Sequence, residues 1–338
     1  MSNLTKKQHY VWRNYLVPWT HNQDLKTGKI YVFRKNPKGR QAKIEHQLLT
    51  KVGFENFYYD ISTFSEKDIN FYKKFIAFFQ RESGILFALN EEEIKTANEE
   101  RDFIEKVAMC PAENIDNKYN FRKRLMDKDM SFYKDSVCRK IEDIFKRAVV
   151  ESIICQEQVL SDKVALELCE YALQSLEDED LKYEFNLFLS MQYFRTPRIH
   201  KNLSDSFEEF KEKANNLTDL NTKFSVNLMA LLFAQKMALN MTYNLNMSMK
   251  LYFNNTSIPF ITGDTPVVNI SDSKTTAEFY YPISPKVAIN VANTDNIKEN
   301  VLITIDESQK KIVEIFNRKL YEKCVNELYS HEESSLNI

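Results

Sequence analysis

Three polar residues, far apart in the sequence, carry side chains that together could cleave a phosphodiester bond: His9, Arg195 and Asp264. A histidine is the usual carrier of a proton near neutral pH, so His9 is a candidate general base or acid. The guanidinium of Arg195 suits two-point binding of a phosphate, and it stabilises the charge of a phosphoryl transition state. Asp264 lies between a predicted strand and a proline-containing turn, from which a carboxylate can point into a cleft.

Two further residues extend this candidate site. Gln192 precedes Arg195 by three positions, so both side chains lie on one face of a predicted helix. Glu142 lies in the segment KIEDIF, which is predicted to form a buried helix. Asp264 and Glu142 supply the hard oxygen ligands that Mg²⁺ or Mn²⁺ prefers, so these two carboxylates are candidate metal ligands.

Each of these residues also has a structural role open to it. Asp264 can accept hydrogen bonds from the backbone of the turn that follows it. Arg195 can end its helix by pairing with Asp264 or with an acidic helix, and Glu142 can be a half-exposed charge on an amphipathic helix. The sequence leaves both sets of roles open.

One histidine has a spacing that resembles a known catalytic pattern. His200 follows Arg195 in RTPRIH, a spacing seen in some helical ribonucleases, but Pro197 interrupts the segment and argues against that pattern. Three other histidines show no partner in the sequence and are expected at the surface: His21, His46 and His331.

Composition excludes several classes of protein. The 338 residues include only five Gly, and no glycine-rich phosphate loop occurs, which argues against a Rossmann or P-loop site. The five Cys are scattered and never form a CxxC pair, so we expect reduced, buried thiols rather than disulfides or a zinc site. The first residues lack a secretory signal and no run of eighteen apolar residues occurs, so we expect a cytoplasmic protein without a membrane span.

Charge is unevenly distributed along the chain. The formal net charge is −2, yet residues 1–50 contain ten Lys or Arg against Asp24 and Glu45, a net charge of about +8. This basic segment also contains Trp19, Tyr31 and Phe33, and it could contact the phosphate backbone of a nucleic acid. The alternative is a solvated hairpin that balances acidic helices elsewhere.

The candidate site residues lie in three parts of the chain: His9 near the start, Glu142, Gln192 and Arg195 in the middle, and Asp264 in the C-terminal third. The secondary structure of each part must position them. Residues 1–62 are predicted to form a small antiparallel sheet behind one short helix: the helix over 9–19, which stops near Pro18, and strands over 29–35, 43–54 and 56–61.

Helical patterns dominate residues 65–246. Apolar residues recur at helical spacing from Ser65 onward, and Ser65 with Asp68 forms a candidate N-cap. Further helices are predicted over 91–109, 137–158, 161–176, 180–194, 204–216 and 221–245.

Strands return in residues 247–330. Short segments rich in β-branched and aromatic residues predict strands over 248–253, 259–262, 277–283, 286–291 and 301–305, and a closing helix over 308–330. Strands at both ends with helices between them favour an α+β fold: one antiparallel sheet built from N- and C-terminal strands, with a large central helical block, in a single domain over 1–338.

Three short stretches carry a resemblance to a known family. The first is His9-Tyr10-Val11, followed by Tyr15-Leu16 and Trp19; the second is QYFRTP at 192–197; the third is FITGDTPVV at 260–268, followed by YPISP at 281–285. In order and spacing they resemble family 4238 of the domains of unknown function, whose members show HYVPxxYLRxF, QxxRTP, TSDNPV and PLSP patterns. The last predicted helix, with Asn317, is also similar to the family's final element, so the resemblance spans essentially the whole chain.

The sequence departs from that family pattern at three places. Trp12 stands where the family usually has Pro, and Pro18 stands where Asn or Gly is common. Gly263-Asp264-Thr265 replaces the usual Ser-Asp-Asn. The first two departures concern the opening helix, and none of the three changes the His, Arg or Asp.

Three classes of function remain open. The first is a nuclease that uses His9 with Asp264 or Glu142, stabilised by Arg195; the resemblance implies a role in bacterial defence or as a toxin. The second is a nucleotide hydrolase or transferase. The third is a non-catalytic binding or regulatory subunit, with a protein partner encoded nearby, in which the same residues join the sheet to the helices.

Overall fold

The structure, a computed structural model, describes residues 7–35, 43–56, 179–213, 217–245, 247–273, 276–293 and 300–337, with a few single positions between 58 and 177. Glu142 and the predicted helices over 91–109 and 137–158 lie outside the described residues. Among the helices that are described, none is long and apolar enough to cross a membrane.

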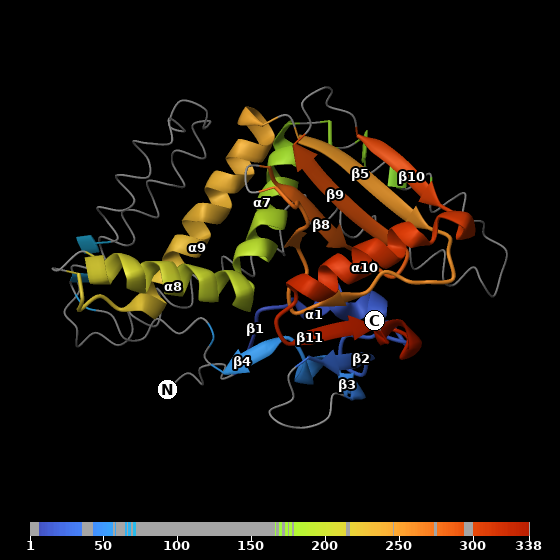
Figure 1. Cartoon of the computed structure of the whole chain (residues 1–338), viewed down its shortest axis with the longest axis horizontal. Helices are drawn as coiled ribbons and strands as arrows, with labels where there is room; N and C mark the ends of the chain where they lie inside the picture. Colours follow the sequence, from blue (N-terminus) through green and yellow to red (C-terminus); the bar gives the residue numbers. More distant parts are fainter. Residues whose placement is uncertain are drawn as a thin grey trace.

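The largest sheet is built from C-terminal strands only (Figure 1). Its central strands pair antiparallel, whereas the strand on one edge runs parallel to its neighbour. In spatial order the strands are β10 (Val301–Ile305), β5 (Met247–Asn254), β9 (Val287–Asn293), β8 (Glu278–Pro282) and β7 (Val268–Asn269).

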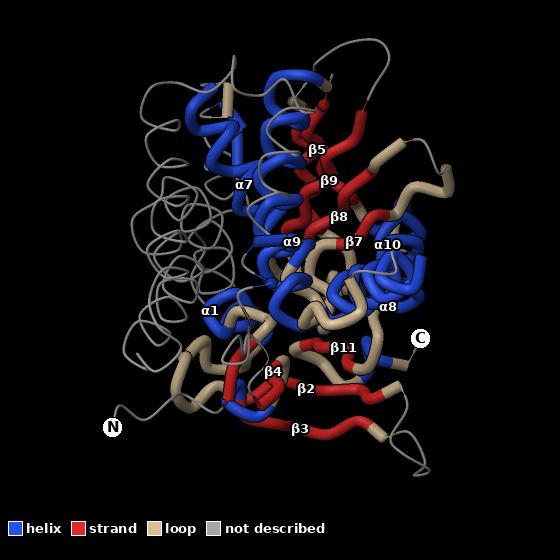
Figure 2. The backbone as a smooth tube through the Cα atoms, turned by 90° about the vertical axis from the view of Figure 1, so that its left-hand side faces the viewer, coloured by secondary structure: helices blue, strands red, loops and turns tan. Residues whose placement is uncertain are grey.

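A second sheet joins the two ends of the chain. An N-terminal hairpin pairs with a strand from the last twelve residues of the chain, and that strand also pairs with one near residue 262. In spatial order the strands are β3 (Ile44–Leu48), β2 (Lys29–Arg34), β11 (Glu327–Ser330) and β6 (Thr262–Gly263). A short pair, β1 (Lys7–His9) with β4 (Phe54–Asn56), lies beside this sheet (Figure 2).

Helices cover both faces of the five-stranded sheet (Figures 1 and 2). On one side lie α7 (Glu179–Phe194), α9 (Thr222–Leu239), its π-helical extension (Asn240–Asn244) and α1 (Arg13–Leu16) with the 3₁₀ turn Val17–Trp19; α8 (Pro197–Lys213) follows α7. On the other side lies α10 (Lys311–Lys323). Short 3₁₀ turns occupy Leu49–Lys51, Glu307–Gln309 and Ser334–Leu336.

The five-stranded sheet separates two hydrophobic cores, because successive side chains of a strand point to opposite faces. Tyr281 and Ile289 pack with residues of α7 and α1, whereas Tyr280 and Ala288 pack with α10. Burial on both faces explains why the pattern over 277–291 is almost continuously apolar rather than alternating.

The prediction of an α+β fold is confirmed, and so is the sharing of a sheet by N- and C-terminal strands. The prediction of one antiparallel sheet is wrong, because most C-terminal strands form their own sheet with a parallel edge. The closing helix predicted over 308–330 ends at Lys323, and residues 327–330 are a strand. The helix predicted over 9–19 begins only at Arg13, since residues 7–9 pair with β4.

Candidate functional site at the start of strand β11

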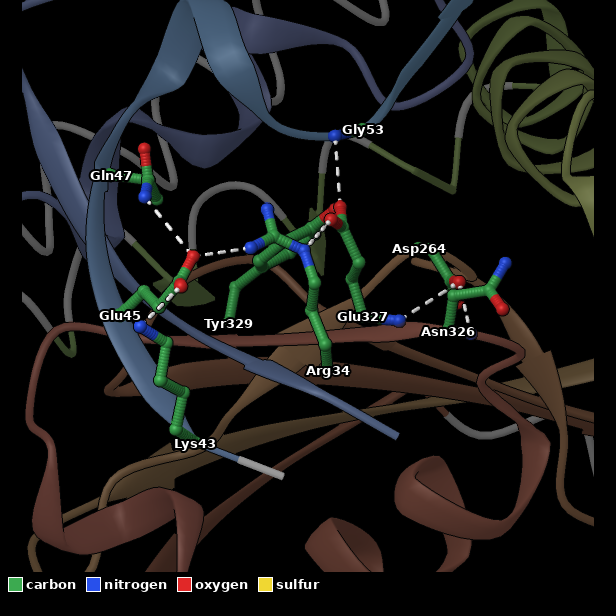
Figure 3. Close-up of polar contacts among 9 residues, drawn as sticks. All are labelled: Arg34, Lys43, Glu45, Gln47, Gly53, Asp264, Asn326, Glu327 and Tyr329. Carbon is green, nitrogen blue, oxygen red and sulfur yellow. Dashed lines mark hydrogen bonds and ion pairs between the residues drawn. The ribbon is translucent and has the colours of Figure 1, made fainter. Parts of the chain in front are cut away.

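Asp264 directly follows β6, is completely buried, and contacts the residues at the start of β11. Its Oδ1 accepts the backbone N–H of Val325 at 2.9 Å, and its Oδ2 accepts those of Asn326 at 2.6 Å and Glu327 at 3.1 Å (Figure 3). The hydroxyl of Thr265 donates to Oδ1 at 3.4 Å. These four donors occupy the lone-pair positions of the carboxylate.

The protonation of Asp264 reflects two opposed effects. Burial raises the pKa of this carboxyl above its usual value, because a charged group loses its hydration, while the three backbone N–H groups lower it. The N–H dipoles present their positive ends to the oxygens, an arrangement that stabilises an anion and repels a cation.

Glu327 connects Asp264 to the N-terminal hairpin. Its Oε1 accepts from Arg34 Nε at 2.9 Å, and its Oε2 accepts from the hydroxyl of Tyr329 at 2.6 Å and from the N–H of Gly53 at 3.2 Å (Figure 3). Arg34 also pairs with Glu45 on the neighbouring strand. The Glu327 side chain is 13% exposed, so its contacts are shielded from water.

Two basic side chains bind the end of helix α10, next to Asp264. Lys35 Nζ donates to the carbonyl oxygens of Tyr321 and Cys324, and Arg198 donates to that of Lys323 at 2.9 Å. Positive charge at a helix C-terminus stabilises the carbonyl groups that lack a partner within the helix. Burial lowers the pKa of Lys35.

Gly263 allows this close packing. A Cβ atom there would lie 2.3 Å from Cys324 Sγ and 2.7 Å from the carbonyl oxygen of Glu327. Only glycine fits this approach of β6 to β11 in this chain.

Arg195 and His9 meet at the end of α7. Arg195 Nη2 donates to the backbone carbonyl of His9 at 3.0 Å, and the hydroxyl of Tyr58 donates to the carbonyl of Arg195 at 3.0 Å. Arg195 is 6% exposed, and the His9 ring packs 5.5 Å from the ring of Phe54. The guanidinium therefore holds the start of the chain on α7.

Gln192 and His200 lie on either side of Arg195. Gln192 is buried, and neither atom of its amide has a hydrogen-bond partner in the part of the chain that the structure describes. The His200 ring stacks on Tyr58 at 5.0 Å. Burial, and then the charges of Arg195 and Lys223, lower the pKa of His200 to about 4.

A chain of hydrogen bonds that involves backbone groups thus connects Arg195 and His9 with Asp264. His9 contacts Arg195, while the next residues, Tyr10 and Val11, donate their N–H groups to the carbonyl of Gly53, whose own N–H reaches Glu327. Glu327 in turn donates its N–H to Asp264. The sequence also predicts that the side chains of His9, Arg195 and Asp264 share one cleft, because their three motifs are far apart in the chain; this stays a prediction.

The described residues offer no group of three or more His, Cys, Asp or Glu arranged to hold a metal ion. Asp264, one of the two candidate ligands, faces N–H groups, and the other, Glu142, lies outside the described residues. Sequence reasoning also missed Glu327 and its partner Arg34. ELYS at 327–330 does not alternate between polar and apolar residues, so the sequence carried no strand signal at Glu327.

The motif residues bind one another across the core. The hydroxyl of Tyr15 lies 2.6 Å from that of Thr262 and donates to the carbonyl of Pro282 at 2.7 Å. Trp19 donates to the carbonyl of Phe260 at 3.1 Å. On the opposite face, the side-chain amide of Asn317 bonds the backbone of Pro259 and Ile261, which fixes α10 to the same loop.

This convergence of separate motifs agrees with the match to a family model. A model described as "Protein of unknown function (DUF4238)" matches residues 7–334. The chain belongs to this family. Neither a curated protein nor a solved structure gave a significant match. In this DUF4238 chain, direct hydrogen bonds join the first motif to the motif at 260–268. The residues of the family pattern therefore connect segments that are far apart in the sequence.

Proposed function

We propose that this chain is a cytoplasmic, non-catalytic binding or regulatory protein. Its proposed partner is a nucleic acid, which is a polyanion. In this proposal the motif residues stabilise the fold and do no chemistry. Asp264 carries the proposal. It is fully buried and its oxygens accept three backbone N–H groups and one hydroxyl. A general base or metal ligand needs access to its reactant and a free lone pair, and Asp264 has neither.

The basic N-terminal segment supports a polyanionic partner. Arg34, Lys35 and Lys43 are already bound to carboxylates or carbonyl groups within the protein. Lys26 and Lys29, by contrast, are exposed, as is Lys51 just beyond the segment. Exposed lysines without a fixed role in the fold are available for phosphate groups, so the net charge of residues 1–50 supports long-range attraction as well as contact.

Substitution of Asp264 tests this proposal against catalysis. Asp264→Asn places an N–H₂ group against backbone donors, and we expect a loss of about 2 to 4 kcal/mol of unfolding free energy in urea. Asp272→Asn is the matched control, because its side chain is 95% exposed, and it should change stability by less than about 0.5 kcal/mol.

The same variants are incubated with RNA and with single- and double-stranded DNA, with and without Mg²⁺ or Mn²⁺. A catalytic carboxylate gives the opposite result to a structural one, since its removal abolishes activity while leaving stability unchanged or higher. Cleavage by the wild type that Asp264→Asn abolishes without loss of stability would therefore refute the proposal.

A specific observation favours a second candidate, a nuclease in bacterial defence or a toxin. Gln192 is a buried amide whose atoms lack partners among the described residues, and it lies in the last turn of α7, three residues before Arg195. Burial and the charges of Arg195 and Lys223 lower the pKa of His200 to about 4, so its imidazole is neutral at pH 7 but a weak base, suited to hydrogen-bond a substrate rather than to take its proton.

This second candidate predicts that RNA or DNA cleavage is lost in folded His200→Ala. Lys201→Ala is the control, because this neighbour on α8 is 72% exposed and pairs only with Asp205 among the described residues. Cleavage that survives His200→Ala, or no cleavage at all, eliminates this candidate.

A further inference from the structure

Three aromatic rings form a cluster on the N-terminal hairpin, here called the ring cluster: His21, Tyr31 and His46. Tyr31 and His46 are directly opposite on β2 and β3, and their rings stack at 4.5 Å with an angle of 18°. The ring of His21 meets both edge-on, at 5.6 Å from Tyr31 and 5.4 Å from His46. The expectation that His21 and His46 lack partners is therefore wrong.

The ring cluster lies at an open edge of the molecule. Strand β3 is the outermost strand of its sheet, with β2 on its inner side. Tyr31 is partly buried against the core beneath α10, whereas His21 and His46 are exposed. One ring of the stack is thus anchored in the protein, and the next presents its outer surface to solvent.

One exposed lysine lies beside the ring cluster, and a second lies close to it in the sequence. Lys29 is exposed and belongs to the same strand face as Tyr31, and its charge acts on the His46 ring. Exposed Lys26 lies in the turn that joins His21 to β2. Three acidic groups of this part of the molecule already have partners: Asp24 accepts from Thr27, Glu332 pairs with His331, and Glu45 pairs with Arg34 and Lys43.

We propose that the ring cluster and Lys29 form a binding surface for single-stranded nucleic acid, in which an unpaired base stacks on the outer face of His46. A base in this position extends a stack that the protein has already ordered, so little conformational entropy is lost. The lysines supply the attraction for the backbone phosphates. This inference rests on the proposed function, because it names the partner class and the contact surface of a binding protein.

The geometry favours an unpaired strand over other polyanions. Duplex DNA hides the faces of its bases, and an acidic peptide gains nothing from a flat ring stack. A strand with free bases uses both the aromatic and the basic parts of the surface, as is typical of single-strand binding sites. Burial and the charges of His21 and Lys29 lower the pKa of His46, so its ring is neutral at pH 7 and stacks without a charge to desolvate.

Fluorescence anisotropy with labelled twelve-nucleotide poly(U) and poly(dT) tests this surface at 50 mM salt. We expect His46→Ala to weaken binding about tenfold, since the variant loses one base stack. His46→Phe keeps the flat ring and should restore binding to within about threefold. Lys29→Ala should reduce the slope of log affinity against log salt by about one unit, while exposed Lys250→Ala, on the other sheet, should not.

The results separate this inference from the proposed function. No binding by the wild type, or equal binding by wild type, His46→Ala and Lys29→Ala, overturns the ring cluster as the surface. Preference for duplex or for poly-glutamate also overturns it, in favour of a different partner class. The fate of the proposed function is decided separately, by the stability and cleavage of Asp264→Asn, which lies in the core.

Discussion

Acidification from pH 7.5 to pH 5.0 should destabilise this protein through His200. The ring is partly buried, stacks on Tyr58, and lies near the positive charges of Arg195 and Lys223. Burial first, and then these two charges, lower the pKa of His200 to about 4, whereas an unfolded chain titrates near its ordinary value of about 6.5. The unfolded state therefore binds the proton more readily across this interval, and stability falls as the pH falls.

The size of the effect follows from the two pKa values. Integration of the proton linkage from pH 7.5 to 5.0 gives about 2 kcal/mol, and we expect about 1 to 2 kcal/mol because solvent reaches part of the ring. This contribution is fully present above pH 6.5 and is lost progressively down to pH 4.

Urea unfolding of wild type and His200→Gln at both pH values isolates this histidine, because the variant lacks the titrating group and other groups cancel in the difference. The wild type should lose about 1 to 2 kcal/mol more than His200→Gln between pH 7.5 and 5.0. An NMR titration of the ring C–H protons gives the folded-state pKa directly. Equal losses in both proteins, together with a pKa near 6.5, would refute the assignment of His200 to a low-dielectric, positively charged environment.

Two further predictions concern the start of β11. Gly263→Ala should cost about 2 to 3 kcal/mol by thermal unfolding, because the new Cβ would meet Cys324 Sγ and a backbone oxygen; an unchanged Tm would show that β6 can move away from β11. Burial raises the pKa of the Cys324 thiol well above its ordinary range. This thiol should therefore resist iodoacetamide at pH 8 in the folded protein and react once urea unfolds it, as measured by peptide mass spectrometry. Rapid labelling of the folded protein would contradict the burial of Cys324.

The sequence predicted correctly those strands and helix ends that depend only on residues close together in the chain. Strand β2 was expected over 29–35 and occupies Lys29–Arg34, since its composition and the turn after it suffice. The predicted N-cap is confirmed, because the N–H of Asp68 donates to Ser65 Oγ at 3.3 Å and the N–H of Ser65 donates to Asp68 Oδ2 at 2.6 Å. The strands predicted over 248–253, 286–291 and 301–305 are present for the same reason.

Long-range contacts account for what the sequence did not reveal. Residues 324–330 continue the helical pattern of α10, but Asp264 binds the N–H groups of Val325, Asn326 and Glu327, which would otherwise serve a helix. The acceptor, Asp264, lies 61 to 63 residues before its three donors in the chain. The ring cluster was missed likewise, since His21, Tyr31 and His46 meet only once β2 and β3 are paired.

The place of β11 near the end of the chain has a consequence for biosynthesis. Strand β2 emerges from the ribosome early, yet its partner Glu327 lies 293 residues later. At about 5 to 20 residues per second, roughly 15 to 60 seconds pass before Arg34 can meet that carboxylate. During this interval the β2–β3 hairpin presents an unpaired strand edge, a surface that associates readily with other extended chains. Nascent chains are therefore exposed to misassembly at β2 until β11 is made, and a chaperone that shields residues 29–34 during translation would protect the whole fold.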